Sequence, residues 1–359
     1  MKSLPPAFVP DELVTDVLSR LALKPLMRFR CVRKSWNSLI SDPTFVKLIL
    51  HRSSQYDYFT LVSAIDFSVS SFTFYPFLKN FPISFTLPKE PYYQLNNAVG
   101  CCNGLLCMVG SSWLNGNIES WFCTWNPITR TMSPRFGSFY DDLTTRFNFT
   151  FGCDKSNNTY KVVTVTRTNV RVFSLLDNAW RDFQTPIGAH YFPMTKVVYM
   201  NGSVNWLAFH HHFGPTDKPS LIISLDLGTE THTQFRPPRG LDIGSFVTPN
   251  LSVLNGSLCF SHDFQQTHFL IWKMKEFGVE DSWPQFLKIS YNNLKIDYPV
   301  NRFNVCLLPL CYSEKNDTLL LKYEEGSILY YGKDNTLEKI SGPWLYTCTN
   351  YVESLVSYC

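Results

Sequence analysis

"VYMNGSVNWLAF", residues 198–209, places an Asn-Gly pair between two runs of apolar and β-branched residues. A type I′ hairpin turn needs positive φ at both of its central residues, which makes Asn-Gly the strongest short signal for a β-hairpin. The same arrangement occurs in "CCNGLLCMV" at 101–109 and in "LSVLNGSLCFSHD" at 251–263. These three stretches predict antiparallel hairpins at intervals along a β-rich chain.

The spacing of the Asn-Gly pairs indicates an internal repeat. Asn103 and Asn201 are 98 residues apart, and Asn201 and Asn255 are 54 apart. The longer interval is twice a period of about 50, and "FGCDKSNNTYKVVTV" at 151–165 supplies a looser hairpin between. Short turns that join a second pair of β-type runs follow each hairpin, in "NPIT", "LLDN", "LGTE", "EFGVED" and "KDN". A repeating four-strand unit of this length is typical of a β-propeller.

Counting these units predicts six blades. Their expected limits are 57–95, 96–140, 141–190, 195–245, 249–300 and 303–340. The terminal "YVESLVSY" at 351–358 is expected to pair into the first blade, which would close the ring and protect its edges. A lopsided β-sandwich is the alternative architecture.

Composition agrees with a folded, mainly β protein. Of the 359 residues, 45% are hydrophobic, 17% are charged and 16% are aromatic, and aromatic side chains pack well on pleated surfaces. "MKSLPPAFVP" at the N-terminus lacks the apolar core of a signal peptide, and no later segment is apolar enough to span a membrane. We therefore expect a cytoplasmic or nuclear protein whose 11 cysteines are buried, reduced thiols.

The first 51 residues have a different pattern, and we call the four-helix unit predicted there the helical knob. The apolar residues of "DELVTDVLSRL" recur at spacings of one, three and four, which is the stripe of an amphipathic helix that begins after Pro10. Three more short helices are expected, one opening at Pro25, one from about Val32 and one at Pro43, with Ser41 or Asp42 as its N-cap. A unit this small buries too little apolar surface to stand alone, so it is expected to dock on another surface.

Charge also separates the knob from the rest of the chain. Residues 1–51 hold eight Lys and Arg against four Asp and Glu, a balance of +4, whereas the remainder holds 24 against 25, a balance of −1. A basic knob suggests an acidic partner. The rival hypothesis is a nucleic-acid contact, which requires Arg28, Arg30, Arg33 and Lys34 to form one exposed patch.

The string from Val9 to Ile40 resembles an F-box of the plant type. Its Pro-Asp-Glu-Leu opening, Leu-Ser-Arg-Leu, Arg-Phe-Arg-Cys-Val and Lys-Ser-Trp, followed by Leu-Ile-Ser-Asp-Pro-Thr-Phe, carry the resemblance. The resemblance implies binding to a Skp-family adaptor and, through it, to a cullin-based ubiquitin ligase. The adaptor contacts that it implies are Pro10, Leu13, Leu26, Cys31, Val32, Lys34, Trp36 and Leu39. Many of these can equally be core of the knob, because one short sequence does not separate core from docking surface.

The remainder resembles the F-box-associated, kelch-like domain of plant F-box proteins. "WNPITR", "VRVFSLLDNAWR" and the closing "YVESLV" carry this resemblance, although the paired glycines of true kelch repeats are missing. The expected fold class is therefore an α+β multidomain protein. A helical F-box domain at 1–51 precedes an F-box-associated domain at 52–359, a six-bladed kelch-like β-propeller that binds substrate.

Linear motifs for catalysis are missing from the sequence. It contains no G-x-S-x-G, H-E-x-x-H or C-x-x-C, so we predict no catalytic residues, no metal site and no cofactor. The pair Cys102 and Cys107 and the pair Cys306 and Cys311 share a C-x4-C spacing in apolar runs, which favours core packing over a metal. A propeller hydrolase remains the alternative, with Asp, Glu and His converging at the central channel.

Binding is expected on one rim of the propeller. Connections between the second and third strands of a blade, and between one blade and the next, share a rim, and here they include long segments that begin at 110, 133, 209, 236 and 262. The target-binding candidates on them are Trp113, Phe139, Tyr140, His210, His211, His212 and Phe213. We thus expect a non-catalytic substrate receptor with a Skp-family adaptor on the knob, an unknown target protein on this rim, and neither nucleic acid nor membrane as partner.

Overall fold

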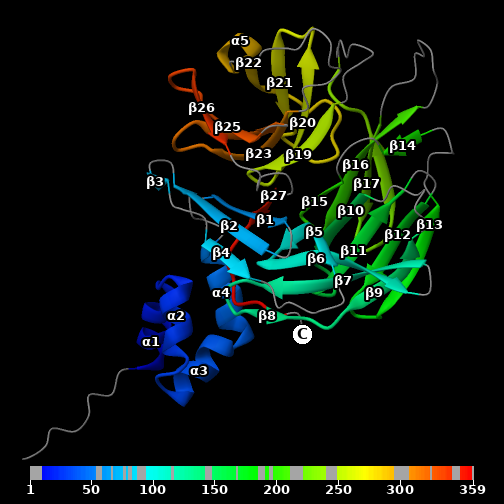
Figure 1. The fold of residues 1–359 in the computed structure, drawn as a ribbon. Helices are drawn as coiled ribbons and strands as arrows, with labels where there is room; N and C mark the ends of the chain where they lie inside the picture. Colours follow the sequence, from blue (N-terminus) through cyan, green and yellow to red (C-terminus); the bar gives the residue numbers. More distant parts are fainter. Residues whose placement is uncertain are drawn as a thin grey trace, which may run out of the picture.

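The computed structural model shows four helices beside a body of β-sheets (Figure 1). It describes residues 10–53, 59–65, 68–75, 78–79, 83–86, 94–114, 117–141, 148–166, 169–184, 191–193, 197–210, 221–239, 249–294, 307–323, 326–341 and 348–357. Within these ranges, no helix combines the length and the apolarity that crossing a membrane would require.

The predicted four helices are confirmed. They are α1 (Asp11–Ser19), α2 (Leu23–Phe29), α3 (Lys34–Ser41) and α4 (Pro43–Ser53). Asp42 is the N-cap of α4, since its Oδ1 accepts a hydrogen bond of 2.8 Å from the backbone N–H of Thr44. Hydrogen bonds from Thr44 lower the pKa of the Asp42 carboxyl. Because α4 ends at Ser53, the helical knob runs slightly past residue 51, and the domain division at 51 and 52 stays a prediction.

The rest of the described chain forms six antiparallel sheets and one short helix, α5 (Tyr291–Leu294). Sheet 1 holds β1 (Phe59–Ile65), β2 (Ser68–Tyr75), β3 (Leu78–Lys79), β4 (Ile83–Thr86) and β27 (Cys348–Tyr351). Sheet 2 holds β5 (Gln94–Cys102), β6 (Leu105–Leu114), β7 (Asn117–Asn126), β8 (Thr131–Met132) and β9 (Phe136–Asp141). Sheet 3 holds β10 (Asn148–Asp154), β11 (Thr159–Val165), β12 (Asn169–Ser174) and β13 (Ala179–Gln184).

Sheets 4 to 6 continue the series. Sheet 4 holds β14 (Tyr191–Pro193), β15 (Val198–Met200), β16 (Ser203–His210), β17 (Leu221–Asp226) and β18 (His232–Phe235). Sheet 5 holds β19 (Asn250–Leu254), β20 (Ser257–Phe264), β21 (His268–Lys273) and β22 (Gln285–Ser290). Sheet 6 holds β23 (Leu308–Ser313), β24 (Thr318–Tyr323), β25 (Gly326–Tyr331) and β26 (Thr336–Ser341).

The six sheets form a ring, as a propeller requires. Their inner strands contact one another in the order β27, β5, β10, β15, β19, β23 and back to β27, and Figure 1 shows these strands around the centre. A sandwich of two packed sheets would not give this cyclic order, so the propeller interpretation is confirmed. Apolar side chains such as Trp206 and Phe260 fill the spaces between neighbouring sheets.

Asn-Gly turns define one rim of this ring. Asn103 and Gly104 have φ of 51° and 76°, and the pairs that begin at Asn201 and Asn255 are also positive at both residues, as type I′ turns require. We call the rim with these turns, and with the turns between third and fourth strands, the turn rim. The opposite rim, which holds the other connections, is the loop rim.

The chain end closes the ring in a different register from the one predicted. β27 pairs with β1, with Tyr351 opposite Thr60, so closure by the C-terminal segment is confirmed. The predicted strand 351–358 is wrong, however, because it shares only Tyr351 with β27. The following residues lie against the turn rim instead, where the Ser354 hydroxyl donates to the Asn103 carbonyl at 2.6 Å.

The helical knob packs on the turn rim. Its core joins buried residues from all four helices to one propeller residue: Leu18, Leu23, Leu26, Ile40, Phe45, Ile49 and Leu355. Ile128, in the turn between β7 and β8, packs against the same cluster. The expectation that this small unit needs a docking surface is therefore confirmed, and the propeller itself supplies part of that surface.

Candidate functional site

Three large apolar side chains of the helical knob are exposed. Leu13 is 58% exposed, Val17 60% and Val32 64%, and we call them the exposed knob residues. Leu13 and Val17 are one turn apart on α1 and share a face, while Val32 lies between α2 and α3. Large apolar side chains exposed on the surface of a small folded unit are typical of a protein interaction site. Sequence reasoning missed Val17, which it placed in the apolar stripe with the core residues.

The other residues implied as adaptor contacts are divided between surface and core. Pro10, Cys31 and Lys34 are exposed. Trp36 and Leu39 are half-buried against the knob core, and the Trp36 ring meets Phe29 edge-on with centroids 5.5 Å apart.

Leu26 has no exposed surface, so its assignment as a contact residue is wrong. Its helix begins at Leu23 and not at Pro25. Leu23 and Leu26 therefore share the face of α2 that points into the knob core.

The four basic side chains that a nucleic-acid contact would need differ in their surroundings. Arg28, Arg33 and Lys34 are exposed. Arg30 is held within the knob, because its Nε donates to Asn37 Oδ1 at 3.0 Å and its Nη2 donates to Ser41 Oγ at 3.2 Å. One of the four required cations is thus occupied by neighbouring side chains of the same unit.

On the loop rim, the structure separates two adjacent aromatic candidates. Tyr140, on β9, is 67% exposed and is paired with Glu119 near the start of β7. Phe139 is only 7% exposed, and its ring lies 5.9 Å from both Phe122 and Trp180 in an aromatic cluster between sheets 2 and 3. Neighbouring residues of a strand point to opposite faces, so Phe139 cannot share the role of Tyr140, and its assignment to target binding is wrong.

Two predicted long loops of this rim are hairpins. β6 runs to Leu114 and β7 begins at Asn117, so the segment from 110 is mostly strand, and the backbone of Trp113 pairs with Ile118. The segment from 262 is also strand, apart from a short turn in which Gln265 and Gln266 have φ of 49° and 56°. The predicted loops at these two places are therefore wrong, because polar residues there pair as strands.

The His-rich candidates are only partly described. His210 is the last residue of β16, and its backbone pairs with Tyr191 of β14. His211, His212 and Phe213 lie outside the described residues, so their assignment to target binding stays a prediction.

A cavity of about 210 Å³ lies at the centre of the ring. Residues of β5, β10, β15, β19 and β23 line it. Their side chains are apolar except for those of Cys101, Thr150, Tyr199 and Ser252. The hydrolase alternative needs Asp, Glu and His at this channel, and the lining residues of the described chain include none of them. Nor does the described part of the chain bring together three or more metal-binding side chains.

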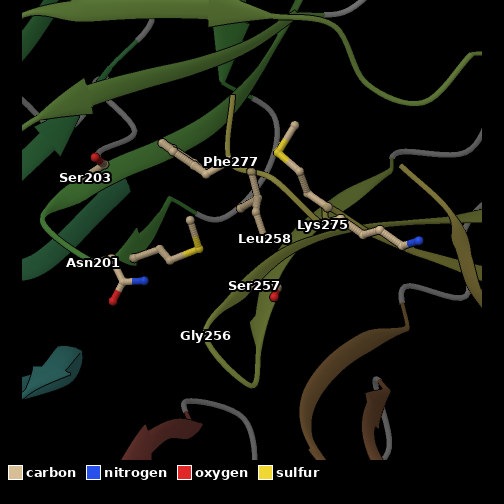
Figure 2. Close-up of a pocket in the computed structure, with 9 residues that line it drawn as sticks. Asn201, Ser203, Gly256, Ser257, Leu258, Lys275 and Phe277 are labelled. Carbon is tan, nitrogen blue, oxygen red and sulfur yellow. The ribbon is translucent and has the colours of Figure 1, made fainter. Parts of the chain in front are cut away.

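A smaller pocket of about 140 Å³ lies on the turn rim between sheets 4 and 5 (Figure 2). Buried Met200, Leu258 and Met274 form its apolar wall, with the half-exposed ring of Phe277 at its edge, and the Lys275 side chain extends away from it. This volume is below the several hundred Å³ typical of ligand pockets. We therefore interpret it as a gap between adjacent turns rather than as a reaction site.

Comparison with known proteins agrees with this architecture. The model of the F-box associated β-propeller domain matches residues 62–358, and the model of the F-box domain matches residues 9–48. The F-box/kelch-repeat protein At3g23880 of Arabidopsis thaliana is 28% identical, with 79% of this chain and 80% of that protein aligned. F-box protein CPR1 of Arabidopsis thaliana is 24% identical over 98% of this chain and 90% of its own length.

Solved structures show more distant likenesses. TolB from Acinetobacter baumannii superposes with a TM-score of 0.44 at 9% identity, over 80% of this chain and 64% of that protein. The SapL1 lectin in complex with α-methyl fucoside also has a TM-score of 0.44 at 9% identity, over 80% of this chain and 93% of the lectin. Because the matched propeller model spans most of its length, the chain belongs to the family of F-box associated β-propeller proteins and carries an F-box domain ahead of the propeller.

Proposed function

We propose that this chain is the substrate-recognition subunit of a Skp-cullin-F-box ubiquitin ligase. In this proposal the helical knob docks a Skp-family adaptor, and the loop rim holds the target protein. F-box domains generally bind such adaptors, and this chain has an F-box domain over residues 9–48. The chain itself would supply no acid, base or nucleophile, since tethering a target beside the conjugating enzyme raises its effective concentration there.

The observation that carries the proposal is the placement of the knob on the ring. Leu355 and Ile128 hold the knob at the turn rim, whereas Tyr140 is exposed toward the loop rim. An adaptor on the exposed knob residues would therefore leave the loop rim free for a second protein. Such separation is what a bridging subunit needs, because the two partners must bind at the same time.

Two matched substitutions test the proposal. Leu13→Asp and Tyr140→Asp each place a carboxylate where a large, mostly exposed apolar side chain stood, so neither should unfold the chain. Leu13→Asp should lose binding to a purified Skp-family adaptor while keeping capture of the target, and Tyr140→Asp should do the reverse. If both folded variants bind the adaptor as tightly as the unmodified chain does, the assignment of the knob is refuted.

A further inference from the structure

Two cysteines meet at the boundary between sheets 2 and 3. Cys102 is the last residue of β5 and Cys153 lies in β10, and β5 and β10 are neighbouring inner strands of the ring. Both thiols are free and buried in one core cluster, with 7% and 5% exposure. Each thiol shifts the pKa of the other, which indicates that the two side chains lie close together across the boundary, and the Cys153 thiol donates to the Asp154 carbonyl at 3.6 Å.

The backbones of the two strands support the same juxtaposition. A Cβ added at Gly100 would lie 3.2 Å from the Phe151 backbone nitrogen, so glycine allows β5 and β10 to approach closely. Cys102 and Cys153 each stand two residues further along the same strands, and side chains recur on one face with a period of two. The two cysteines therefore stand at equivalent positions, two residues beyond the close approach of Gly100 to Phe151.

The surroundings make the two thiols unequal. Interaction with Cys102 is the largest effect on the pKa of Cys153 and lowers it. Burial and the negative charge of Asp154 oppose this, while the positive charge of Lys155 and a hydrogen bond from Asn103 support it. The pKa of Cys102 is raised, first by its interaction with Cys153 and then by burial. A thiol of lowered pKa beside a second thiol of raised pKa is the arrangement of an attacking and a resolving cysteine.

The cavity at the centre of the ring lies close to this pair. Gly100, Phe151 and Tyr199 line the cavity, and the Tyr199 hydroxyl donates to the Cys153 carbonyl at 2.9 Å. The thiols thus lie just behind the wall of a space of about 210 Å³, which is many times the volume of a peroxide molecule.

We propose that Cys102 and Cys153 are an oxidisable pair that closes to a disulfide between β5 and β10 when the protein meets hydrogen peroxide. The Cys153 thiolate attacks one peroxide oxygen, the O–O bond breaks, and hydroxide leaves, which gives a sulfenic acid on Cys153. The Cys102 sulfur then attacks the Cys153 sulfur, the S–O bond breaks, and the thiol proton and the departing hydroxyl leave as water. Overall, two thiols lose two electrons and one peroxide becomes two waters.

This disulfide would lie beside the attachment of the helical knob. The residue after Cys102 is Asn103, whose carbonyl accepts the hydrogen bond of Ser354, and Leu355 follows in the knob core. The oxidised form would therefore link sheets 2 and 3 covalently at the point where the chain end holds the knob.

The test is peroxide treatment of the folded full chain, alkylation of the remaining thiols and peptide mapping by mass spectrometry. In a Cys101→Ser background, which removes the adjacent cysteine, the expected product is one disulfide-linked peptide pair joining Cys102 to Cys153, cleaved by reductant. Cys102→Ser should leave a sulfenic acid on Cys153 that a dimedone probe traps. Cys153→Ser should slow peroxide oxidation of Cys102 by at least about tenfold, because the lower-pKa thiol is gone.

Cys107 and Cys123 supply the matched control. They are also buried, at 0% and 2% exposure, on neighbouring strands of sheet 2. Because they belong to different core clusters, they should stay reduced and become alkylated only after unfolding. The proposal is overturned if Cys102 and Cys153 both stay alkylatable after peroxide treatment, or if the folded chain links either of them to another cysteine instead.

Discussion

The helical knob and the propeller cover their apolar side chains to different extents. The described residues include seven exposed large apolar side chains: Leu13, Val17, Val32, Tyr140, Leu176, Phe277 and Val279. Three of the seven lie within residues 10–53, a small fraction of the described chain. Leu355 of the propeller is also buried in the knob core. A four-helix unit of this size does not cover all of its own apolar residues, so its exposed face is available to a partner. Among the propeller residues whose burial the structure describes, most large apolar side chains are buried.

The largest expected loss of stability comes from breaking a buried ion pair of the propeller. Lys161 Nζ lies 3.2 Å from Asp154 Oδ2 and 2.9 Å from Glu230 Oε1, and the Lys161 and Asp154 side chains are 5% and 0% exposed. Lys161→Met leaves the buried Asp154 carboxylate without its cation, although Glu230 keeps Arg181 at 2.8 Å, and should lower the free energy of unfolding by about 3–5 kcal/mol. Urea denaturation measures this change.

The control for Lys161 is Arg171→Met. It breaks the Arg171–Asp182 pair, whose side chains are 30% and 69% exposed, and should cost at most about 1 kcal/mol. Equal losses of stability in the two variants would show that the buried ion pair contributes no more to folding than the exposed one.

The next effect contrasts core and surface within the knob. Leu26→Ala should cost about 2–5 kcal/mol because Leu26 is fully buried, whereas Leu13→Ala should stay within about 0.5 kcal/mol because Leu13 is 58% exposed. Thermal and urea unfolding of both variants check this. A larger cost for Leu13→Ala would place Leu13 in the core and remove it from the docking surface.

A smaller effect is expected where the knob meets the ring. Leu355→Ala removes the propeller residue buried in the knob core and should cost about 2 kcal/mol, at the low end for leucine truncation, because the site lies between two units. Hydrogen exchange should speed up in α1 to α4 and stay unchanged in sheet 3. Faster exchange in both regions would mean that the knob and the ring unfold together.

The smallest expected change in stability concerns Glu353, which lies two residues before Leu355. Burial raises the pKa of Glu353, and the nearby charge of Lys24 opposes this only in part. A carboxyl with a raised folded-state pKa contributes stability below its unfolded value near 4.5 and loses that contribution as the pH rises through the folded value. Glu353→Gln should therefore raise the melting temperature at neutral pH and change it little near pH 4.5. An equal shift at both pH values would exclude titration of Glu353 as its cause.

Local signals predicted much of the fold. The stripe in "DELVTDVLSRL" and the prolines at 10, 25 and 43 predicted four helices, and the Asn-Gly pairs predicted the hairpins of the turn rim, because both signals depend on residues close in sequence. The repeat length predicted a propeller, and a propeller has its sheets in cyclic order. These features needed no knowledge of which side chains meet across the ring.

The loop rim and the thiol pair could not be predicted in the same way. The predicted loop at 262 includes His262, yet this residue is buried on β20, where its Nδ1 lies 2.8 Å from the Asp263 carbonyl oxygen and the Trp272 indole donates to its Nε2. The C-x4-C spacing of Cys102 and Cys107 favours core packing, and nothing in that spacing indicates that Cys102 shares a core cluster with Cys153 of the next sheet. Both outcomes depend on contacts between strands far apart in sequence, which local patterns do not encode.

The most direct test of the central claim is isothermal titration of a purified Skp-family adaptor into two folded variants, Leu13→Asp and Leu176→Asp. The two leucines are 58% and 66% exposed and both lie on the knob side of the ring, so the substitutions differ only in which unit carries the charge. We expect Leu13→Asp to weaken binding by at least about tenfold, as for loss of an interface anchor, and Leu176→Asp to leave it unchanged. Unchanged affinity for Leu13→Asp, or an equal loss for both, would contradict adaptor docking on the exposed knob residues.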